Sequence, residues 1–173
     1  MPDYPVRRGI RLPDHNYASP GAYFITVCTR NRDCLLGEIR DGRPCLSPAG
    51  EVISAVWRDI PLHFAVVEQD AFEIMPNHVH GIIVIHGRGT ACRAPTADFG
   101  QPVAGSIPTI VRSFKAEATR RINTFRRTPG APVWQRGYYE HIIRSPRELD
   151  RLRSYIGSNP LRWALDHENS AHA

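Results

Sequence analysis

The sequence predicts a single α+β domain spanning residues 1–173, and three observations lead to this class. The chain has 173 residues, 42% of them hydrophobic, which is enough to bury one core. Runs of β-branched and aromatic residues alternate with helical patterns in the order strand, helix, strand, strand, helix, strand, helix. No apolar run approaches the roughly 18 residues needed to cross a membrane, so we expect a soluble protein.

A strand, a short hairpin and a helix are predicted in the first third of the chain. Residues 21–29, GAYFITVCT, are aromatic and β-branched and predict the first strand. The segment around Asp41, with a glycine on either side of it, predicts a loop or short hairpin. Ser47 is expected to cap a helix with Pro48 in its first turn, and Pro61 should end this helix.

The motif MPNHVHGIIVI at 75–85 follows a second extended segment at 63–74. A strand alternates its faces, so His78 and His80 should point the same way, roughly 7 Å apart, and Val79 the other way. The apolar residues after them indicate a strand covered on both faces. Neutral imidazole is the commonest protein metal ligand, so the pair is a candidate divalent-metal site. Two polar residues on a solvated face would have the same spacing.

Three further elements are expected in the second half. Residues 86–106 contain many Gly, Pro and Thr residues without a period and predict a flexible surface loop. Residues 107–127 have apolar residues at helical spacing, with Ser106 as the cap. Residues 133–144 alternate well enough to predict a strand, with a bulge at Gly137.

The last predicted helix opens with the capping box Ser145-Pro146-Arg147-Glu148. Tyr155 lies one turn before Asn159, so the two side chains should share a face. Pro160 disfavours helical geometry at the preceding residue, and the helix should therefore end at Asn159. Residues 167–173 predict a disordered tail. The residues expected to pack the tail onto the sheet are Leu161, Trp163 and Leu165.

Composition points to a nucleic-acid partner and a reducing compartment. The net charge is +5, and Lys115 is the one lysine among 22 basic residues. Arginine suits phosphate and base contacts, although a GC-rich genome would give the same bias. The basic N-terminus lacks the apolar run of a secretory signal, so we expect a cytoplasmic protein. The cysteines have no CxxC pairing and are expected to be thiols, not zinc ligands: Cys28, Cys34, Cys45 and Cys92.

Five blocks of the chain together resemble the REP-associated tyrosine transposases, a branch of the single-tyrosine HUH transposases. The blocks are GAYFITVCTRN at 21–31, MPNHVHGIIVI at 75–85, IVRSFKAEATRRIN at 110–123, VWQRGYYEHIIR at 133–144 and LRSYIGSNPLRW at 152–163. The resemblance implies a ferredoxin-like antiparallel sheet with helices packed on one face. It also implies metal-dependent nicking and strand transfer of single-stranded DNA, with palindromic hairpin repeats as the expected substrate.

The resemblance also implies a role for each site residue. His78 and His80 would hold a divalent metal, Mg²⁺ or Mn²⁺, with Asn159 as the third ligand. Tyr155 would attack a DNA phosphodiester and form a 5′-phosphotyrosine. A phenol is a weak nucleophile at neutral pH, which is why such a reaction needs a metal. Tyr138 and Tyr139 are rival nucleophiles, and His141 is either a further ligand or a structural histidine.

Single-stranded or hairpin DNA is thus the expected partner of a monomer or homodimer, which would be bacterial and nucleoid-associated when bound to DNA. An irregular basic arm at 1–20 and the polar face of the 107–127 helix are expected to grip it, although that face could equally be solvated surface. Two alternatives are a DNA-binding protein that does not cut and a phosphodiesterase that uses water. The candidate DNA contacts are Arg7, Arg8, Arg11, Arg112, Lys115, Arg120, Arg121 and Arg136.

Overall fold

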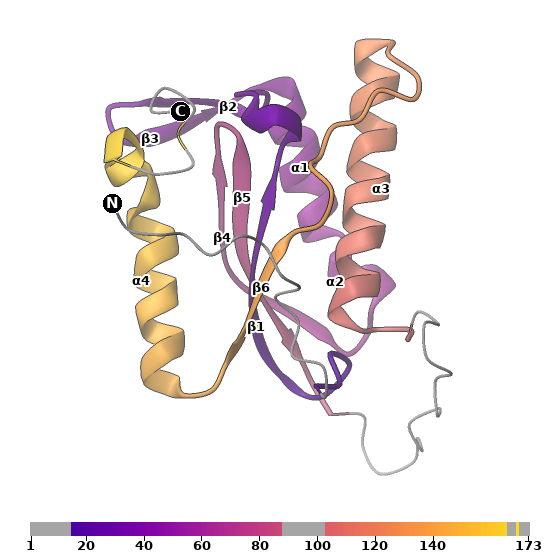
Figure 1. Cartoon of the computed structure of the whole chain (residues 1–173), viewed down its shortest axis with the longest axis vertical. Coiled ribbons are helices and arrows are strands. Elements are labelled where there is room, and N and C mark those ends of the chain that lie inside the picture. The colour runs from indigo at the N-terminus through magenta and orange to yellow at the C-terminus, as the bar shows by residue number, and fades with distance from the viewer. Residues whose placement is uncertain (1–14, 88–102, 166–168, 170–173) are drawn as a thin grey trace.

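A computed structural model describes residues 15–87, 103–165 and 169 of the chain (Figure 1). Its centre is a four-stranded antiparallel sheet with the strand order β4-β5-β1-β6. Strand, helix, two strands, helix and strand follow one another along the chain, which is the ferredoxin-like arrangement. The predicted α+β class is therefore confirmed. The strands of this sheet are β1 (Gly21–Cys28), β4 (Val67–Met75), β5 (His78–Ile85) and β6 (Tyr139–Ile143).

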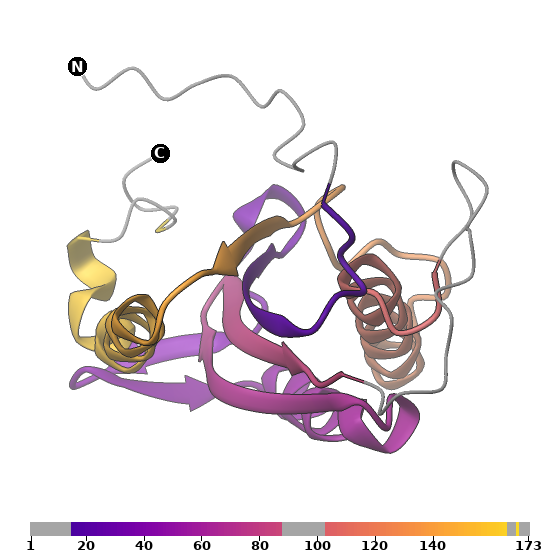
Figure 2. The same ribbon diagram turned by 90° about the horizontal axis from the view of Figure 1, so that it is seen from below.

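Helices cover both faces of the sheet (Figures 1 and 2). The helices α1 (Pro48–Arg58) and α3 (Ile107–Arg126) pack on one face, and α4 (Pro146–Arg162) packs on the other. The expectation that the helices share one face is therefore corrected. Ile156 of α4 is buried against Ile82 of β5, so α4 covers the face that α1 and α3 leave open.

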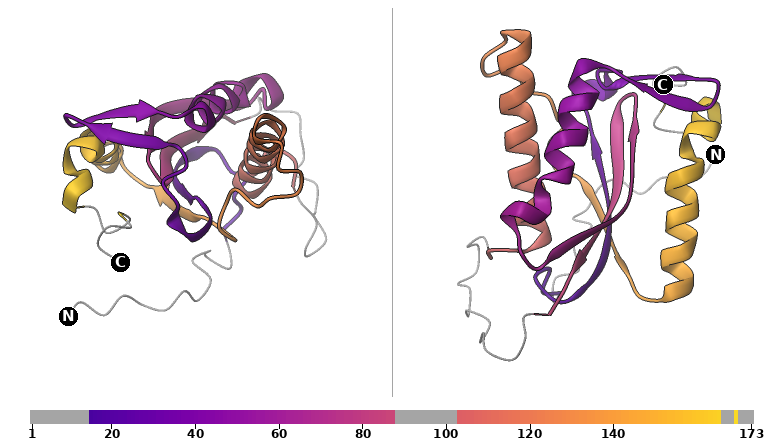
Figure 3. Two further views of the ribbon diagram at one scale, coloured as in Figure 1. Left: turned by 90° about the horizontal axis from the view of Figure 1, so that it is seen from above. Right: turned by 180° about the vertical axis from the view of Figure 1, so that it is seen from behind.

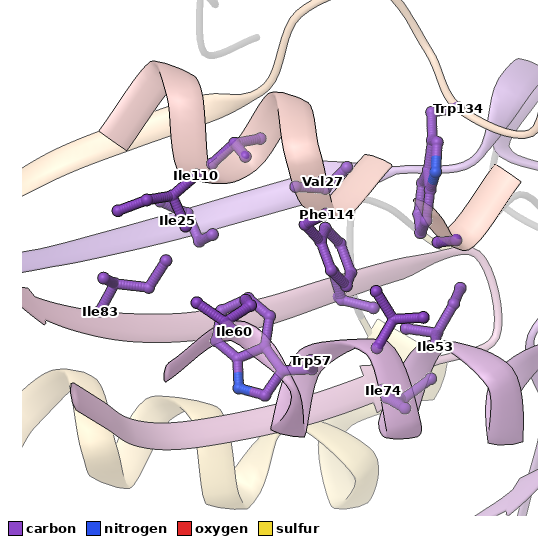
Figure 4. Packing of buried hydrophobic residues seen from close by; sticks show 14 of the residues in the cluster. Ile25, Val27, Ile53, Trp57, Ile60, Ile74, Ile83, Ile110, Phe114 and Trp134 are labelled. Atoms are coloured by element: carbon purple, nitrogen blue, oxygen red, sulfur yellow. The ribbon is translucent and has the colours of Figure 1, made fainter. Parts of the chain in front are cut away.

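The larger core lies between the sheet and the α1–α3 layer (Figure 4). Ile25 and Val79 point into it from the two central strands, and both are fully buried. The rings of Trp57 from α1 and Phe114 from α3 meet edge to face at 5.5 Å between centroids. A Cβ on Gly81 would lie 2.4 Å from the Trp57 ring, so glycine is what lets α1 approach β5 so closely.

A separate hairpin stands at one end of the sheet, as predicted (Figure 3). The sequence-based boundaries beside it are less accurate, because α1 ends at Arg58 and Pro61 lies within a second, short helix instead of ending the first. The next strand begins at Val67, four residues later than expected. The remaining elements are β2 (Gly37–Arg40), β3 (Arg43–Leu46), α2 (Ile60–His63) and two short 3-10 turns, η1 (Arg30–Arg32) and η2 (Trp163–Leu165).

The last strand is shorter than predicted. Pairing between β1 and β6 begins at Tyr139, while Trp134 makes an isolated bridge to Thr29. Gly137 has a φ of +73°, a left-handed conformation that glycine adopts without strain. The chain therefore turns before β6, and the predicted bulge within a longer strand is replaced by this turn.

The prediction that the last helix ends at Asn159 is wrong. The helix α4 continues to Arg162 with Pro160 inside it, and both Asn159 and Pro160 are buried. Proline costs one helical hydrogen bond, but burial of this face against the sheet outweighs the local preference. The expected packing of the tail also fails for two residues, because Leu161 and Leu165 are 74% and 87% exposed.

Parts of three predictions lie outside the described residues. They are residues 1–14 of the predicted basic arm, residues 88–102 of the predicted surface loop, and most of the tail after residue 165. No helix in the described part of the chain is both long and apolar enough to cross a membrane. Cys28, Cys34 and Cys45 form no disulfide among the described residues, and Cys92 is outside them.

Candidate active site

The paired histidines lie at the start of β5, on the face covered by α4. His78 is fully buried and His80 is 3% exposed. Their Nε2 atoms are 3.0 Å apart, so the two rings converge as the alternation of the strand predicted. A pair on a solvated face is therefore ruled out as an explanation of this motif.

The Nδ1 atom of each histidine ring lies within hydrogen-bonding distance of a side-chain oxygen. Oδ1 of Asn77 lies 2.8 Å from Nδ1 of His78, and Oγ1 of Thr26 lies 2.8 Å from Nδ1 of His80. The Asn77 amide is oriented because its Nδ2 donates to the carbonyl of Arg32. Its Oδ1 therefore accepts a hydrogen bond from the Nδ1–H group of His78, which favours the tautomer whose Nε2 can bind a metal. The Thr26 hydroxyl can rotate to accept in the same way from His80.

The helix α4 and its C-cap residue Trp163 place three side chains at successive turns over this pair. The ring of Tyr155 is 5.3 Å from the ring of His80, and the ring of Trp163 is 6.0 Å from that of His78, between centroids. Asn159 lies midway between them on the helix and is 2% exposed. Because residues four apart share a helix face, Asn159 faces the same way as its two neighbours.

Polar contacts fix α4 on the sheet. The guanidinium group of Arg153 donates to both carboxylate oxygens of Asp70 in β4, at 2.9 and 2.6 Å. Arg153 also lowers the pKa of Asp70, because its hydrogen bonds to the carboxylate, and then its positive charge, favour the charged form. His141 of β6 lies 2.8 Å from the carboxylate of Glu148 in the first turn of α4. This contact favours the structural interpretation of His141.

The arrangement fits a divalent cation. Two nitrogens 3.0 Å apart are spaced like neighbouring ligands of one ion at about 2.1 Å each. Nδ2 of Asn159 is one of two buried side-chain atoms without a hydrogen-bond partner among the described residues. The amide can turn over and present its oxygen at the same position. Among the described residues, no cluster of three or more His, Cys, Asp or Glu side chains could hold a metal ion.

Two further residues next to the pair were missed by the sequence analysis. The ring of Phe24 stacks on that of His80 at 5.4 Å and 25°. Glu73 stands directly opposite His80 on β4, and burial raises the pKa of its carboxyl group. The pattern of either strand alone gives no sign of these contacts, because they depend on which strands pair and in what register.

The two rival tyrosines point to opposite faces of the sheet, Tyr138 from just before β6 and Tyr139 from its first residue. Tyr138 donates its hydroxyl proton to Glu140 and packs against the larger core. Tyr139 pairs in register with Thr26 and therefore points to the face that carries His80. Its ring is 6.2 Å from that of Phe24, whereas Tyr155 contacts His80 itself. Tyr155 is therefore the best-placed phenol.

The basic residues of α3 lie on the opposite face of the sheet from the histidines. Lys115 donates to the carbonyls of Gln135 and Gly137, at 2.7 and 2.9 Å, and burial lowers its pKa. Arg120 and Arg121 both pair with Glu117 of the same helix. Contact of these residues with DNA stays a prediction. Of the other candidates, Arg112 and Arg136 are exposed, whereas Arg7, Arg8 and Arg11 lie outside the described residues.

The sheet order and the helices define a ferredoxin-like α+β domain with a buried histidine pair, and a protein of known structure shares this fold. A REP-associated tyrosine transposase solved in complex with a REP hairpin superposes with a TM-score of 0.54 and 24% identity, over 94% of this chain and 74% of that one. A candidate transposase from Deinococcus radiodurans gives 0.48 and 18% identity, over 85% of this chain and 96% of its own. This protein thus has the fold of the REP-associated tyrosine transposases.

Its family membership follows from a sequence relative. The chain is 40% identical over 166 residues to an uncharacterised protein of Haemophilus influenzae, covering 92% of this chain and 91% of that protein. It therefore belongs to the same family as the Haemophilus protein. No protein-family profile matches the sequence.

Proposed function

We propose that this protein nicks single-stranded DNA and transfers the cut strand through a covalent tyrosine intermediate. The observation that carries the proposal is the position of Tyr155, whose ring lies 5.3 Å from His80 beside the converging histidine pair. Asn159 follows one turn later on the same helix and is buried. The fold shared with a REP-associated tyrosine transposase supports the same activity.

Tyr155 is the proposed nucleophile. Its phenolic oxygen attacks the phosphorus of a phosphodiester, and the bond from phosphorus to the 3′ oxygen breaks. The phenol gives up its proton to solvent, and the leaving 3′ oxygen takes one up. The products are a 5′-phosphotyrosine and a 3′-hydroxyl. Because one phosphodiester replaces another, no ATP is needed, and attack by another 3′-hydroxyl completes the transfer.

His78, His80 and Asn159 are the residues that would hold the divalent cation, Mg²⁺ or Mn²⁺. When bound, such an ion polarises the phosphate and stabilises the charge that develops during attack. Asn77 and Thr26 keep the imidazole Nε2 atoms directed towards one point, and the packing of α4 keeps the phenol beside them. The protein thus supplies preorganisation, which lowers the barrier without any movement of the sheet.

The proposed substrate is a DNA hairpin with an unpaired flanking segment. The structurally similar transposase is bound to a REP hairpin, which supports this class of DNA. The exposed side chains of Arg112 and Arg136 are available for phosphate contacts. Such contacts add affinity without reading sequence, so the hairpin itself must supply part of the specificity.

The test is an adduct assay with a labelled REP-type hairpin and Mn²⁺. Wild-type protein should form a DNA adduct that survives SDS, and Tyr155→Phe should form none. Tyr138→Phe is the matched control, because this hydroxyl is bonded to Glu140 and lies on the other face of the sheet. The Tyr138→Phe protein should still form the covalent DNA adduct.

Two results would overturn the proposal. A gel shift with no cleavage would indicate a DNA-binding protein that does not cut. Cleavage with no covalent adduct, unaffected by Tyr155→Phe, would indicate a phosphodiesterase that uses water.

A further inference from the structure

An exposed aromatic ring lies beside the candidate active site without taking part in the chemistry proposed above. Tyr139 begins β6, an edge strand of the sheet, and is 43% exposed. The ring is therefore accessible to a ligand that approaches the site from this edge of the sheet. Its neighbour Tyr138, by contrast, is packed against the larger core.

The register of the strands sets how far Tyr139 is from the histidines. Tyr139 pairs with Thr26, and Thr26 pairs with His80, so the three residues form one row across the sheet. Two strand spacings of about 4.8 Å separate the backbones of Tyr139 and His80 by about 10 Å. The row ends at Tyr139, on the edge strand of the sheet.

The ring of Phe24 contacts the rings of both Tyr139 and Tyr155. Its ring centroid is 6.2 Å from that of Tyr139 and 6.1 Å from that of Tyr155, and both contacts are edge to face. Phe24 itself is buried and stacks on His80. A base lying on Tyr139 would therefore be a near neighbour of a phosphodiester held at Tyr155.

The position of Tyr139 is held firmly by the preceding turn. Lys115 donates to the carbonyls of Gln135 and Gly137, and Trp134 donates its indole proton to the carbonyl of Lys115. These contacts anchor the chain to α3 just before β6 begins. A ring on an anchored strand loses little entropy when a ligand stacks on it.

Positive charge lies at both ends of β6. Arg136 precedes the strand and Arg144 follows it, and both side chains are exposed. An aromatic ring between two arginines is the arrangement that suits single-stranded DNA, since bases stack on the ring while guanidinium groups contact the phosphates.

We infer that Tyr139 is a stacking platform for an unpaired DNA base next to the phosphodiester that Tyr155 attacks. This inference rests on the proposed function, because it takes DNA as the substrate and Tyr155 as the nucleophile. It makes Tyr139 a positioning residue whose ring, and not its hydroxyl group, is needed.

The experiment measures stacking without cleavage, in the Tyr155→Phe background. The probe is a REP-type stem-loop DNA with single-stranded extensions on both sides, carrying 2-aminopurine at each unpaired position in turn. Stacking of this base on an aromatic ring quenches its fluorescence. One position should be quenched on binding, and adding Tyr139→Phe should keep that quench. Adding Tyr139→Ala or Tyr139→Leu should abolish it and weaken binding roughly 5- to 100-fold.

Phe125→Ala is the matched control, since this ring is also exposed but lies on α3, on the other side of the sheet. It should change neither the quench nor the dissociation constant. Tyr139→Leu keeps an apolar side chain on the strand, so it serves if Tyr139→Ala fails to fold. A quench that survives both substitutions, or no quenched position at all, would overturn the inference.

The two proposals fail in different ways. If wild-type protein forms the adduct but Tyr139→Ala leaves the quench unchanged, stacking is refuted and strand transfer stands. If the quench depends on the ring but no adduct forms, the base platform stands and the nucleophilic role of Tyr155 is refuted.

Discussion

At the scale of single residues, the site depends on which nitrogen of each imidazole carries the proton. A histidine can bind a metal through Nε2 only when its proton is on Nδ1 and the ring is held in place. Asn77 does this for His78, and Thr26 is positioned to do it for His80. The two Nε2 atoms lie 3.0 Å apart and face each other, at the spacing of two ligands of one ion.

Removing the Thr26 hydroxyl should weaken metal binding. Thr26→Val keeps the shape of the side chain but cannot accept from His80 Nδ1, so the ring loses its preferred tautomer. Loss of a hydrogen bond that orients a metal-binding histidine typically lowers metal affinity about 10- to 100-fold. Isothermal titration with Mn²⁺ checks this, with Thr26→Ser as the control that keeps the hydroxyl. Equal affinities of the wild-type and Thr26→Val proteins would contradict it.

At the scale of elements, close approach of α1 to the sheet depends on a residue without a side chain. Gly81 faces Trp57, which in turn stacks on Phe72 at 4.3 Å with nearly parallel rings. Gly157 of α4 is the opposite case, because no atom of the described residues lies within 4 Å of where its Cβ would be. The two glycines should therefore respond in opposite ways to the same substitution.

Gly81→Ala should lower the free energy of unfolding by about 1–3 kcal/mol, because the methyl group would overlap Trp57 and force the packed layer apart. Gly157→Ala should raise it by up to about 1 kcal/mol, since alanine is the better helix former. Urea denaturation of both variants checks the signs. A destabilised Gly157→Ala protein or an unaffected Gly81→Ala protein would show that the packing differs from this description.

An ion-pair network joins α3 to the end of α1. Arg121 donates to Glu117 on its own helix and to Asp59 at the C-terminus of α1, while Arg120 also donates to Glu117. These hydrogen bonds lower the pKa of Glu117 to about 2. The charged carboxylate is therefore stabilised in the folded protein relative to the unfolded chain.

The stability from Glu117 should depend on pH in a definite direction. A lowered pKa contributes stability that is fully present above the unfolded value of about 4.5 and is lost as the pH falls towards 2. The groups are partly exposed and screened by salt, so we expect Glu117→Gln to cost about 1 kcal/mol at pH 7. Urea titrations at pH 7 and pH 3 check this. A cost that does not shrink at pH 3 would point to lost packing instead of lost charge.

At the scale of the whole molecule, the two faces of the sheet have different contents. One face carries the histidines, Phe24 and the α4 residues, and the other carries the large core with α1 and α3 above it (Figures 1 and 4). The long basic helix that the sequence suggested as a DNA grip is thus behind the sheet as seen from Tyr155. A DNA strand that contacts both α3 and Tyr155 must pass around an edge of the sheet. The strand β6, flanked by Arg136 and Arg144, forms one such edge.

This separation predicts that catalysis and binding can be lost independently. His78→Ala should abolish adduct formation while hairpin affinity stays within about tenfold, because arginines supply most of the affinity. Arg136→Ala should do the reverse, weakening binding at 150 mM salt more than the single-turnover rate at saturating protein. Gel-shift and adduct assays on both variants test this. Equal loss of binding and cleavage in His78→Ala would contradict it.

Local patterns along the chain were enough to predict several parts of the protein. Strand alternation placed His78 and His80 on one face, and helical spacing placed Tyr155 and Asn159 together, because both patterns depend only on backbone geometry. The serine caps Ser47 and Ser145 were predictable for the same reason, and both accept the expected backbone hydrogen bonds. Ser106 stands at the predicted cap position of α3, but its hydroxyl donates to the carbonyl of Val103 and caps no backbone N–H group. Even the class of fold follows from the order of such elements.

Tertiary structure alone decided what lies opposite each of these residues. Contacts between segments far apart in sequence determine three features. They place α4 on its side of the sheet, they bring Thr26 and Phe24 to His80, and they allow α4 to continue through Pro160. Burial of a whole helix face outweighs the local cost of one proline, and strand register determines which side chains face each other. The sequence could name the residues of the site, but only packing could assemble them.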